Sequence, residues 1–189
     1  MNRFRVVLDA CVLYPAPVRD LLLELTLEGL YQAHWTDEIH EEWTRNVLKD
    51  RPDLKPENLL RTRQLMDQHA EAARVDHYQP LIEGLVLPDA NDRHVLAAAI
   101  RCHADAIVTF NLKDFPESAL APWGIEAIHP DDFVTYQFDL NMPKVCAAAK
   151  TIRQRLRSPP RSAEEYVERL RTCGLPRTAD RYDGCLPLL

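Results

Sequence analysis

The chain has 189 residues, of which 46% are hydrophobic, and a formal net charge of −6 at pH 7. A chain of this length and composition forms one ordinary domain, or one domain with a helical appendage, and buries an apolar core. The mildly acidic charge gives no general support for a nucleic-acid partner, and no apolar run reaches membrane-spanning length, which argues against a membrane protein.

The first half of the sequence alternates short apolar runs with amphipathic stretches. The continuous apolar run from Phe4 to Ala10 is typical of a strand that is buried on both faces of a parallel sheet. Asp9 interrupts this run too early for a signal peptide, so the sequence predicts a cytoplasmic protein. The pattern that follows predicts a helix over 18–28, a strand over 30–35, and helices over 36–50 and 56–73.

The second half continues this alternation and then becomes helical. An apolar helix is predicted over 92–103, strands over 105–110 and 124–129, and helices from 130, over 143–156 and over 163–173. Alternating strands and helices predict an α/β fold with a central, mostly parallel sheet flanked by helices. We expect this domain to span residues 1–139 and a C-terminal helical extension to span residues 140–189.

Basic residues and cysteines are both distributed unevenly. Residues 140–163 contain six Lys or Arg residues and no Asp or Glu. Such a stretch is either a solvated helix face or a contact surface for an acidic partner or a nucleic-acid backbone. The five cysteines are widely spaced and form no Cys-x-x-Cys motif, which favours free thiols in a reducing compartment over disulfides or a zinc site.

Acidic residues stand at the ends of the predicted strands. Asp9 ends the first strand, Asp114 follows the strand over 105–110, and Asp92 precedes the helix that leads into that strand. The carboxyl ends of parallel strands meet at one edge of a sheet, and a helix packed on the sheet runs back so that its N-terminus lies at the same edge. We therefore expect Asp9, Asp92 and Asp114 to converge there.

Converging carboxylates repel one another unless a cation lies among them. Oxygen ligands of this kind suit Mg²⁺ or Mn²⁺, which serve phosphoryl chemistry. Each residue alone also fits a turn or a helix cap, and Asp89 fits an N-cap especially well, so this hypothesis depends on their convergence. The chain has no glycine-rich phosphate loop and no Gly-x-Ser-x-Gly motif, and His94 is expected to point outward from its helix.

Four segments together resemble a known family. VVLDACVL, TDEIHEEW, DANDRHVLAAAI and AIVTFNLKDFP occur in the order and at the spacing of the PIN domain, and most closely resemble PIN-domain ribonucleases that act as VapC-type toxins. The resemblance covers residues 5–138, and the C-terminal helices are similar to the appendage of one subgroup. It implies metal-dependent hydrolysis of RNA that leaves 5′-phosphate and 3′-hydroxyl ends. It also implies an antitoxin protein that blocks the acidic site, and it makes a homodimer possible.

The resemblance also assigns roles to individual residues. It makes Asp9, Glu42 and Asp92 members of the catalytic set, to which we add Asp114, and it makes Asp9 and Asp92 the ligands of Mg²⁺ or Mn²⁺. Glu38 and Glu41 are alternative positions for the helical glutamate, and Asp89 is an alternative or supporting ligand.

The sequence departs from the commonest family pattern at two positions. Asn111 stands where Thr-x-Asp is usual, so Asp114 is expected to restore the missing carboxylate, and the site is left open between one and two ions. Cys11 stands where many relatives have a polar residue, which weakens the expectation of a hydrogen bond from that position. Because Asn111 carries no charge, the alternative to an enzyme is a catalytically weak PIN-like module that binds RNA or a partner protein. Phosphatases that need Asp-x-Asp fit less well, because Asp9-Ala10-Cys11 lacks the second acid.

Overall fold

The computed structural model describes residues 4–189 of the chain. The contacts divide it into two compact units. The first, called the sheet unit here, comprises the residues up to Tyr14 and Tyr31–His129, and the second, called the helical unit, comprises Pro15–Leu30 and Pro130–Leu189. No helix within residues 4–189 combines the length and the apolar character that crossing a membrane requires.

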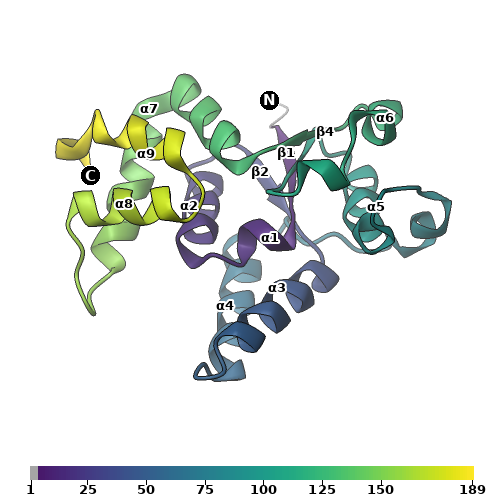
Figure 1. The fold of residues 1–189 in the computed structure, drawn as a ribbon, viewed down its shortest axis with the longest axis horizontal. Coiled ribbons are helices and arrows are strands. Elements are labelled where there is room, and N and C mark those ends of the chain that lie inside the picture. The colour runs from purple at the N-terminus through teal and green to yellow at the C-terminus, as the bar shows by residue number, and fades with distance from the viewer. Residues whose placement is uncertain (1–3) are drawn as a thin grey trace. The chain divides into compact units, whose positions relative to one another are not determined.

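Residues 4–189 contain four strands, which form one parallel sheet in the order β2-β1-β3-β4 (Figure 1). The strands are β1 (Arg5–Leu8), β2 (Gln32–His34), β3 (Ala106–Val108) and β4 (Glu126–Ile128). Val7 at the centre of the sheet lies beside His34 of β2 and Ile107 of β3. The apolar side chains of β1 and β3 are buried on both faces, as a run without polar alternation requires. This sheet confirms the predicted α/β fold.

Helices and 3₁₀ segments surround the sheet. The helices of the sheet unit are α1 (Ala10–Leu13), α3 (Asp37–Asp50), α4 (Pro56–His69), α5 (Arg93–Arg101) and α6 (Glu117–Leu120), and the 3₁₀ segments are η1 (Gln79–Gly84), η2 (Ala90–Asp92), η3 (Leu112–Asp114) and η4 (Ala121–Trp123). α5 packs on β1 and β3 through residues that are buried from Val95 to Ala99. Thr36 caps α3, since its hydroxyl accepts a hydrogen bond from the Ile39 N–H at 3.1 Å.

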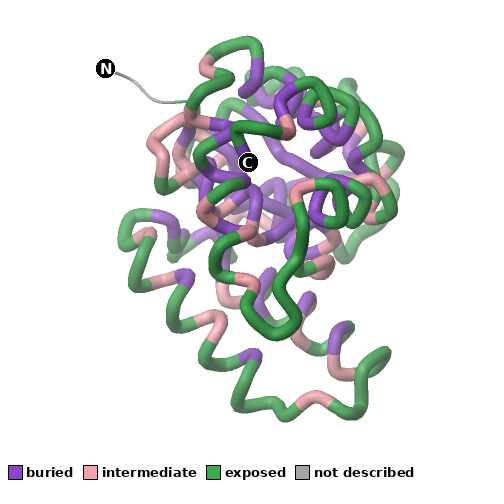
Figure 2. The backbone as a smooth tube through the Cα atoms, turned by 90° about the vertical axis from the view of Figure 1, so that its left-hand side faces the viewer, coloured by how far each residue is buried: buried purple, intermediate pink, exposed green. Residues whose placement is uncertain are grey.

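α3 and α4 form a hairpin that is exposed along much of its length (Figures 1 and 2). α4 ends at His69, earlier than the sequence predicts. Beyond it, the Trp35 N–H donates to the Ala73 carbonyl at 3.0 Å and the Val75 N–H donates to the Trp35 carbonyl at 2.9 Å. These residues are therefore extended beside Trp35, because their backbone groups pair there and not within a helix.

The helical unit contains α2 (Ala16–Leu27), α7 (Pro130–Arg155), α8 (Ala163–Thr172), α9 (Pro176–Asp183) and η5 (Leu186–Leu188). α7 bends at Asn141, whose backbone angles are not helical, just before Pro143. The Asn141 side chain accepts a hydrogen bond from the Lys144 N–H at 3.2 Å, so it caps the second half. The helices predicted from 130 and over 143–156 are therefore two halves of one bent helix.

Apolar packing and ion pairs hold the helical unit together. α2 and α9 both pack against α7, and α8 packs against α9. The Arg155 guanidinium donates to the buried Glu24 at 2.6 Å, Lys144 donates to the Glu28 carbonyl, and Arg153 donates to the Leu189 carbonyl at 3.0 Å. Part of the basic stretch therefore makes contacts inside the unit. The predicted boundary between residues 139 and 140 stays a prediction, and the compact units divide the chain differently, with α2 beside the C-terminal helices.

Candidate active site

Asp9 is the most firmly held of the predicted site residues. It follows β1 directly, and its N–H continues the ladder to β3 by donating to the Val108 carbonyl at 3.1 Å. Its side chain is buried, and Oδ1 accepts the Ala10 N–H at 2.7 Å, which caps α1. Oδ2 accepts the Thr109 hydroxyl at 2.8 Å and the Cys11 thiol at 3.1 Å. The sheet and these donors together fix one carboxylate at the carboxyl edge.

The hydrogen bond from Cys11 contradicts the expectation from the sequence. Burial and the nearby Asp9 carboxylate raise the pKa of the Cys11 thiol far above its ordinary value, so the thiol keeps its proton and can donate it. The sulfur also accepts the Phe110 N–H at 3.3 Å and lies 3.3 Å from the Thr109 hydroxyl. The Cys11 thiol therefore acts as a hydrogen-bond donor and acceptor, as a hydroxyl would, and links the loop after β3 to Asp9.

Burial dominates the electrostatics of Asp9. Burial raises its pKa, the hydrogen bonds from Cys11 and Thr109 oppose that rise, and the Glu42 carboxylate adds to it. Donors that stabilise a carboxylate would ordinarily lower its pKa, so the remaining rise reflects a desolvated anion beside another anion.

The electrostatics of Asp92 connect it with the other predicted acids. It is half-buried at the junction of η2 and α5. Burial raises its pKa to about 7, and further contributions come from the negative charges of Asp9, Asp89, Asp114 and Glu42. Each of those four carboxylates must therefore lie close enough to act on Asp92. We call these five residues the acidic cluster; of them, Asp9 follows β1 and Asp114 follows β3, beyond the carboxyl ends of these strands.

The loop after β3 brings Asp114 to the cluster. The Asn111 N–H donates to the Thr109 hydroxyl at 2.9 Å, and the Asp114 N–H donates to the Asn111 carbonyl at 3.0 Å. These bonds close a tight turn, and η3 within it carries Asp114 back toward Asp92. Asp114 acts electrostatically on Asp92, and Asp89 both caps η2, through a 2.8 Å bond from the Asn91 N–H, and acts on Asp92 in the same way.

Three glutamates of α3 were candidates for the helical position. Glu42 acts electrostatically on both Asp9 and Asp92, and its carboxylate lies 3.6 Å from Nε2 of His94. Glu38 accepts the Tyr78 hydroxyl at 3.0 Å and lies 3.8 Å from Nδ1 of His94. Glu41 is exposed. The structure therefore brings Glu42 to the acidic cluster and anchors Glu38 beside it.

His94 and Thr109 are site residues whose positions the sequence did not reveal. The expectation that His94 points outward is wrong, since it is 5% exposed and lies between Glu38 and Glu42. Burial lowers its pKa, but attraction to Glu42, Glu38 and Asp9 outweighs this and leaves the pKa raised. The available signal was its place in the first turn of α5, beside Asp92, where a side chain faces the same edge as the acids.

The oxygen donors of the cluster fit a hard divalent cation that keeps most of its water. Within residues 4–189, no group of three or more His, Cys, Asp or Glu side chains is arranged to hold a metal ion by itself. Mg²⁺ does not require such a cage, since it is commonly bound through one or two carboxylates with waters completing its octahedral shell. Asp9 and Asp92 could provide these carboxylates, and a cation would offset both the burial and the neighbouring negative charges that raise their pKa values.

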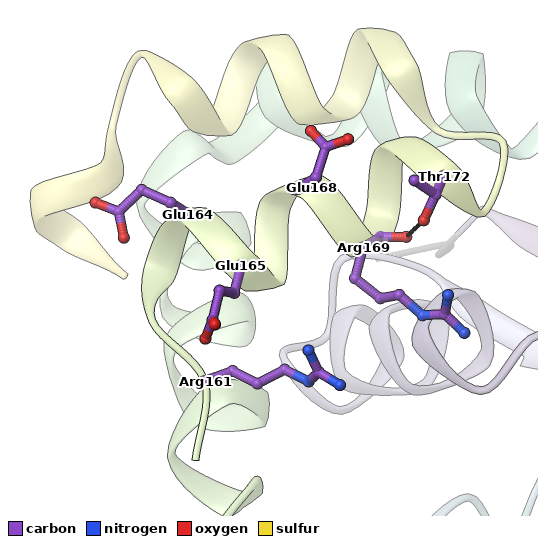
Figure 3. A pocket seen from close by; sticks show the side chains of 6 residues that line it. All are labelled: Arg161, Glu164, Glu165, Glu168, Arg169 and Thr172. Atoms are coloured by element: carbon purple, nitrogen blue, oxygen red, sulfur yellow. Dashed lines mark hydrogen bonds between the residues drawn. The ribbon is translucent and has the colours of Figure 1, made fainter. Parts of the chain in front are cut away.

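Two pockets lie away from the acidic cluster. One, in the helical unit, is lined along α8 by Arg161, Glu164, Glu165, Glu168, Arg169 and Thr172 (Figure 3). Several of these side chains serve the ends of α8, since Glu165 completes a capping box with Ser162 and the Thr172 hydroxyl donates to the Arg169 carbonyl at 3.0 Å. The other, in the sheet unit, lies beside Asp105 and Trp123 near the amino ends of β3 and β4, at the opposite edge of the sheet. Neither pocket includes a residue of the cluster.

Two family models and one curated relative match parts of the chain. Residues 5–113 match a family model described as PIN domain, and residues 130–183 match one described as VapC50 C-terminal domain. A protein of Mycobacterium tuberculosis (strain ATCC 25618 / H37Rv) named "Putative ribonuclease VapC50" is 63% identical over 49 residues, which are 26% of this chain and 29% of that protein. No solved structure matches the chain.

Proposed function

The chain belongs to the PIN domain family, and from this premise we propose that it is a divalent-metal-dependent endoribonuclease, the toxin of a toxin–antitoxin pair. The observation that carries the proposal is the acidic cluster, in which the charges of four other carboxylates act on Asp92. Carboxylates packed in this way make the apoprotein less stable than neutral residues would, which is typical of a site built for a cation. The ribonuclease name of the relative and the family match support RNA as the substrate.

Each residue of the cluster has a proposed role in hydrolysis. Mg²⁺ or Mn²⁺, held by Asp9 and Asp92, would polarise the scissile phosphate and lower the pKa of the attacking water. Thr109, Cys11 and the Ala10 N–H fix Asp9 so that it need not reorganise when substrate binds. Glu42 and Asp114 accept hydrogen bonds from the water and orient it. The attacking water would lose a proton to solvent as its oxygen bonds to phosphorus, the bond between phosphorus and the 3′ oxygen would break, and that oxygen would take up a proton from solvent.

The negative charge of the acidic cluster also suits it to bind a basic partner protein. A cluster of carboxylates with residues still partly exposed is complementary to a cationic side chain, so a protein antitoxin that inserts an Arg would block it. A homodimer remains part of the proposal, and the cytoplasmic location stays a prediction. The alternative, a catalytically weak module, was motivated by Asn111, and the charge of Asp114 on Asp92 favours the enzyme.

Cleavage of labelled RNA by the purified chain tests the proposal. With Mg²⁺ or Mn²⁺ we expect products that carry 5′-phosphates, and we expect none with EDTA. Asp9→Asn and Asp92→Asn should each lower the rate by about 10³-fold, the range for losing a preorganised charged group. Asp180→Asn, at an exposed ion pair of the helical unit, is the matched control and should cleave normally.

Cleavage that persists in EDTA or in both cluster variants would contradict the mechanism. If the wild-type chain binds RNA without cleaving it under any metal condition, the alternative of a binding module is the correct one.

A further inference from the structure

His94 occupies a buried place that apolar packing alone does not explain. Its imidazole is 5% exposed in the first turn of α5, where the neighbouring Val95 and Leu96 are fully apolar and almost completely buried. A buried polar group is costly unless polar partners surround it. The polar atoms facing the ring are the carboxylates of Glu38 and Glu42, which lie one helical turn apart on α3.

The two nitrogens of His94 face different glutamates. Nε2 lies 3.6 Å from Glu42 and Nδ1 lies 3.8 Å from Glu38, and Nδ1 makes no hydrogen bond within the described residues. Glu38 already has a partner, since the buried Tyr78 donates its hydroxyl to the same Oε2 atom at 3.0 Å. Glu42, by contrast, is a member of the acidic cluster and is repelled by Asp9 and Asp92. Of the two, Glu42 therefore has the greater need of a partner that keeps it in place.

We propose that His94 is a positioning residue that holds the Glu42 carboxylate against the acidic cluster through the Nε2 side of its ring. Without this contact, repulsion from Asp9 and Asp92 would move the flexible Glu42 side chain from its partly exposed position on α3 toward solvent. The inference rests on the proposed function, because the role of Glu42 is to orient the attacking water. His94 lies in the same turn as Asp92, so α5 would position an acid directly and a second acid through His94.

Two neutral substitutions of His94 test the roles of its two ring nitrogens separately. The amide nitrogen of glutamine can occupy the place of Nε2, and that of asparagine the place of Nδ1. His94→Gln therefore keeps a donor for Glu42, whereas His94→Asn offers one to Glu38 alone. Both variants lose the same titratable group, so any difference between them reflects the position of the donor and not the charge of the ring.

Turnover kinetics on RNA give the first readout. We expect His94→Gln to keep kcat within about threefold of wild type and His94→Asn to lower kcat at least about tenfold, with little change in KM, because the orientation of the water is lost and RNA binding is not. In a Glu42→Gln background, His94→Asn should cause no further loss. Equal kcat values for the two His94 variants, or an undiminished effect of His94→Asn without Glu42, would overturn the inference.

Mn²⁺ affinity, measured by calorimetry on the free chain, gives a readout that needs no catalysis. Displacement of Glu42 removes negative charge from the cluster, so His94→Asn should weaken Mn²⁺ binding by about the same factor as Glu42→Gln, while His94→Gln should not. Glu38→Gln changes only the group that faces Nδ1 and leaves the Nε2 contact with Glu42, so this variant should bind Mn²⁺ as wild type does. Identical affinities of His94→Asn and His94→Gln would contradict the positioning role. A wild-type chain that binds Mn²⁺ and shows this pattern without cleaving RNA would refute the proposed nuclease and leave the role of His94 standing.

Discussion

The acidic cluster and the helical unit both contain several carboxylates, but the neighbours of these carboxylates have opposite charges in the two regions. In the helical unit the acids face arginines: Arg171 pairs with Asp180 at 2.5 Å and with Asp183 at 2.7 Å, and Arg155 pairs with Glu24 at 2.6 Å. In the cluster, burial and the charges of the neighbouring acids together raise the pKa of Asp92 to about 7. Ion pairs with arginine connect the helices of that unit, whereas the cluster gathers carboxylates that act on one another, which is the pattern expected of the proposed cation site.

The largest effect that distinguishes the acidic cluster from the paired acids of the helical unit is expected from Asp114. We expect Asp114→Asn to lower the rate of RNA cleavage by about 10- to 100-fold, the range for residues that support a metal site, because its charge acts on Asp92. Asn111→Ala changes the neighbouring residue, which supplies a backbone carbonyl to the turn, and should stay within a few-fold of wild type. Single-turnover cleavage measures both. A larger loss from Asn111→Ala than from Asp114→Asn would assign the missing role to the amide.

A smaller effect should follow from removing the donors that fix Asp9. Cys11→Ala removes the thiol that lies 3.1 Å from Oδ2, and we expect a loss of about tenfold in cleavage rate. Cys11→Ser replaces the thiol with a hydroxyl that can donate in the same direction and should restore most of the rate. If Cys11→Ala and Cys11→Ser cleave equally fast, the thiol is a packing residue and not a hydrogen-bond donor to the site.

The stability of the metal-free protein should depend on pH in the sense opposite to that of paired acids. Asp92 has a folded-state pKa of about 7, above that of an unfolded aspartate, so the folded state binds the proton more tightly. Stability therefore falls as the pH rises from about 5 to about 8, and the raised pKa of Asp9 acts in the same direction. Melting in EDTA measures this. Asp92→Asn should raise Tm at pH 8 by about 3 °C or more and flatten the profile; an unchanged slope would mean that the pKa of Asp92 is not raised in the folded state.

The smallest expected effect concerns an ion pair of the helical unit. Arg155→Met leaves Glu24, which is 9% exposed, without its 2.6 Å partner, and should reduce the free energy of unfolding by about 1 kcal/mol, since Arg155 itself is largely exposed. Adding Glu24→Gln should recover part of that loss in chemical denaturation. RNA cleavage should be unchanged in both variants. A loss of cleavage with normal stability would show that this arginine serves the substrate and not the fold.

The sequence predicted the convergence of the acids because it needed only strand order and direction. Asp9 and Asp114 follow buried apolar strands, and Asp92 starts the helix between them, so a parallel sheet brings them to one edge. The direction of His94 was not predictable in this way, because it depends on how α3 packs against the first turn of α5. The pairing of α2 with the C-terminal helices was equally hidden, since nothing local in Ala16–Leu27 distinguishes a helix that covers the sheet from one that joins another unit. The hydrogen bond from Cys11 was not predicted, because the donor role of this thiol arises from its burial beside Asp9.

Calorimetric titration of the metal-free chain with Mn²⁺ tests the central claim most directly, since it measures whether the acidic cluster binds a divalent cation. We predict that the wild-type chain and Asp180→Asn bind Mn²⁺ with the same affinity and that Asp92→Asn shows no measurable binding. Binding to Asp92→Asn with wild-type affinity, or no binding to the wild-type chain, would contradict the account.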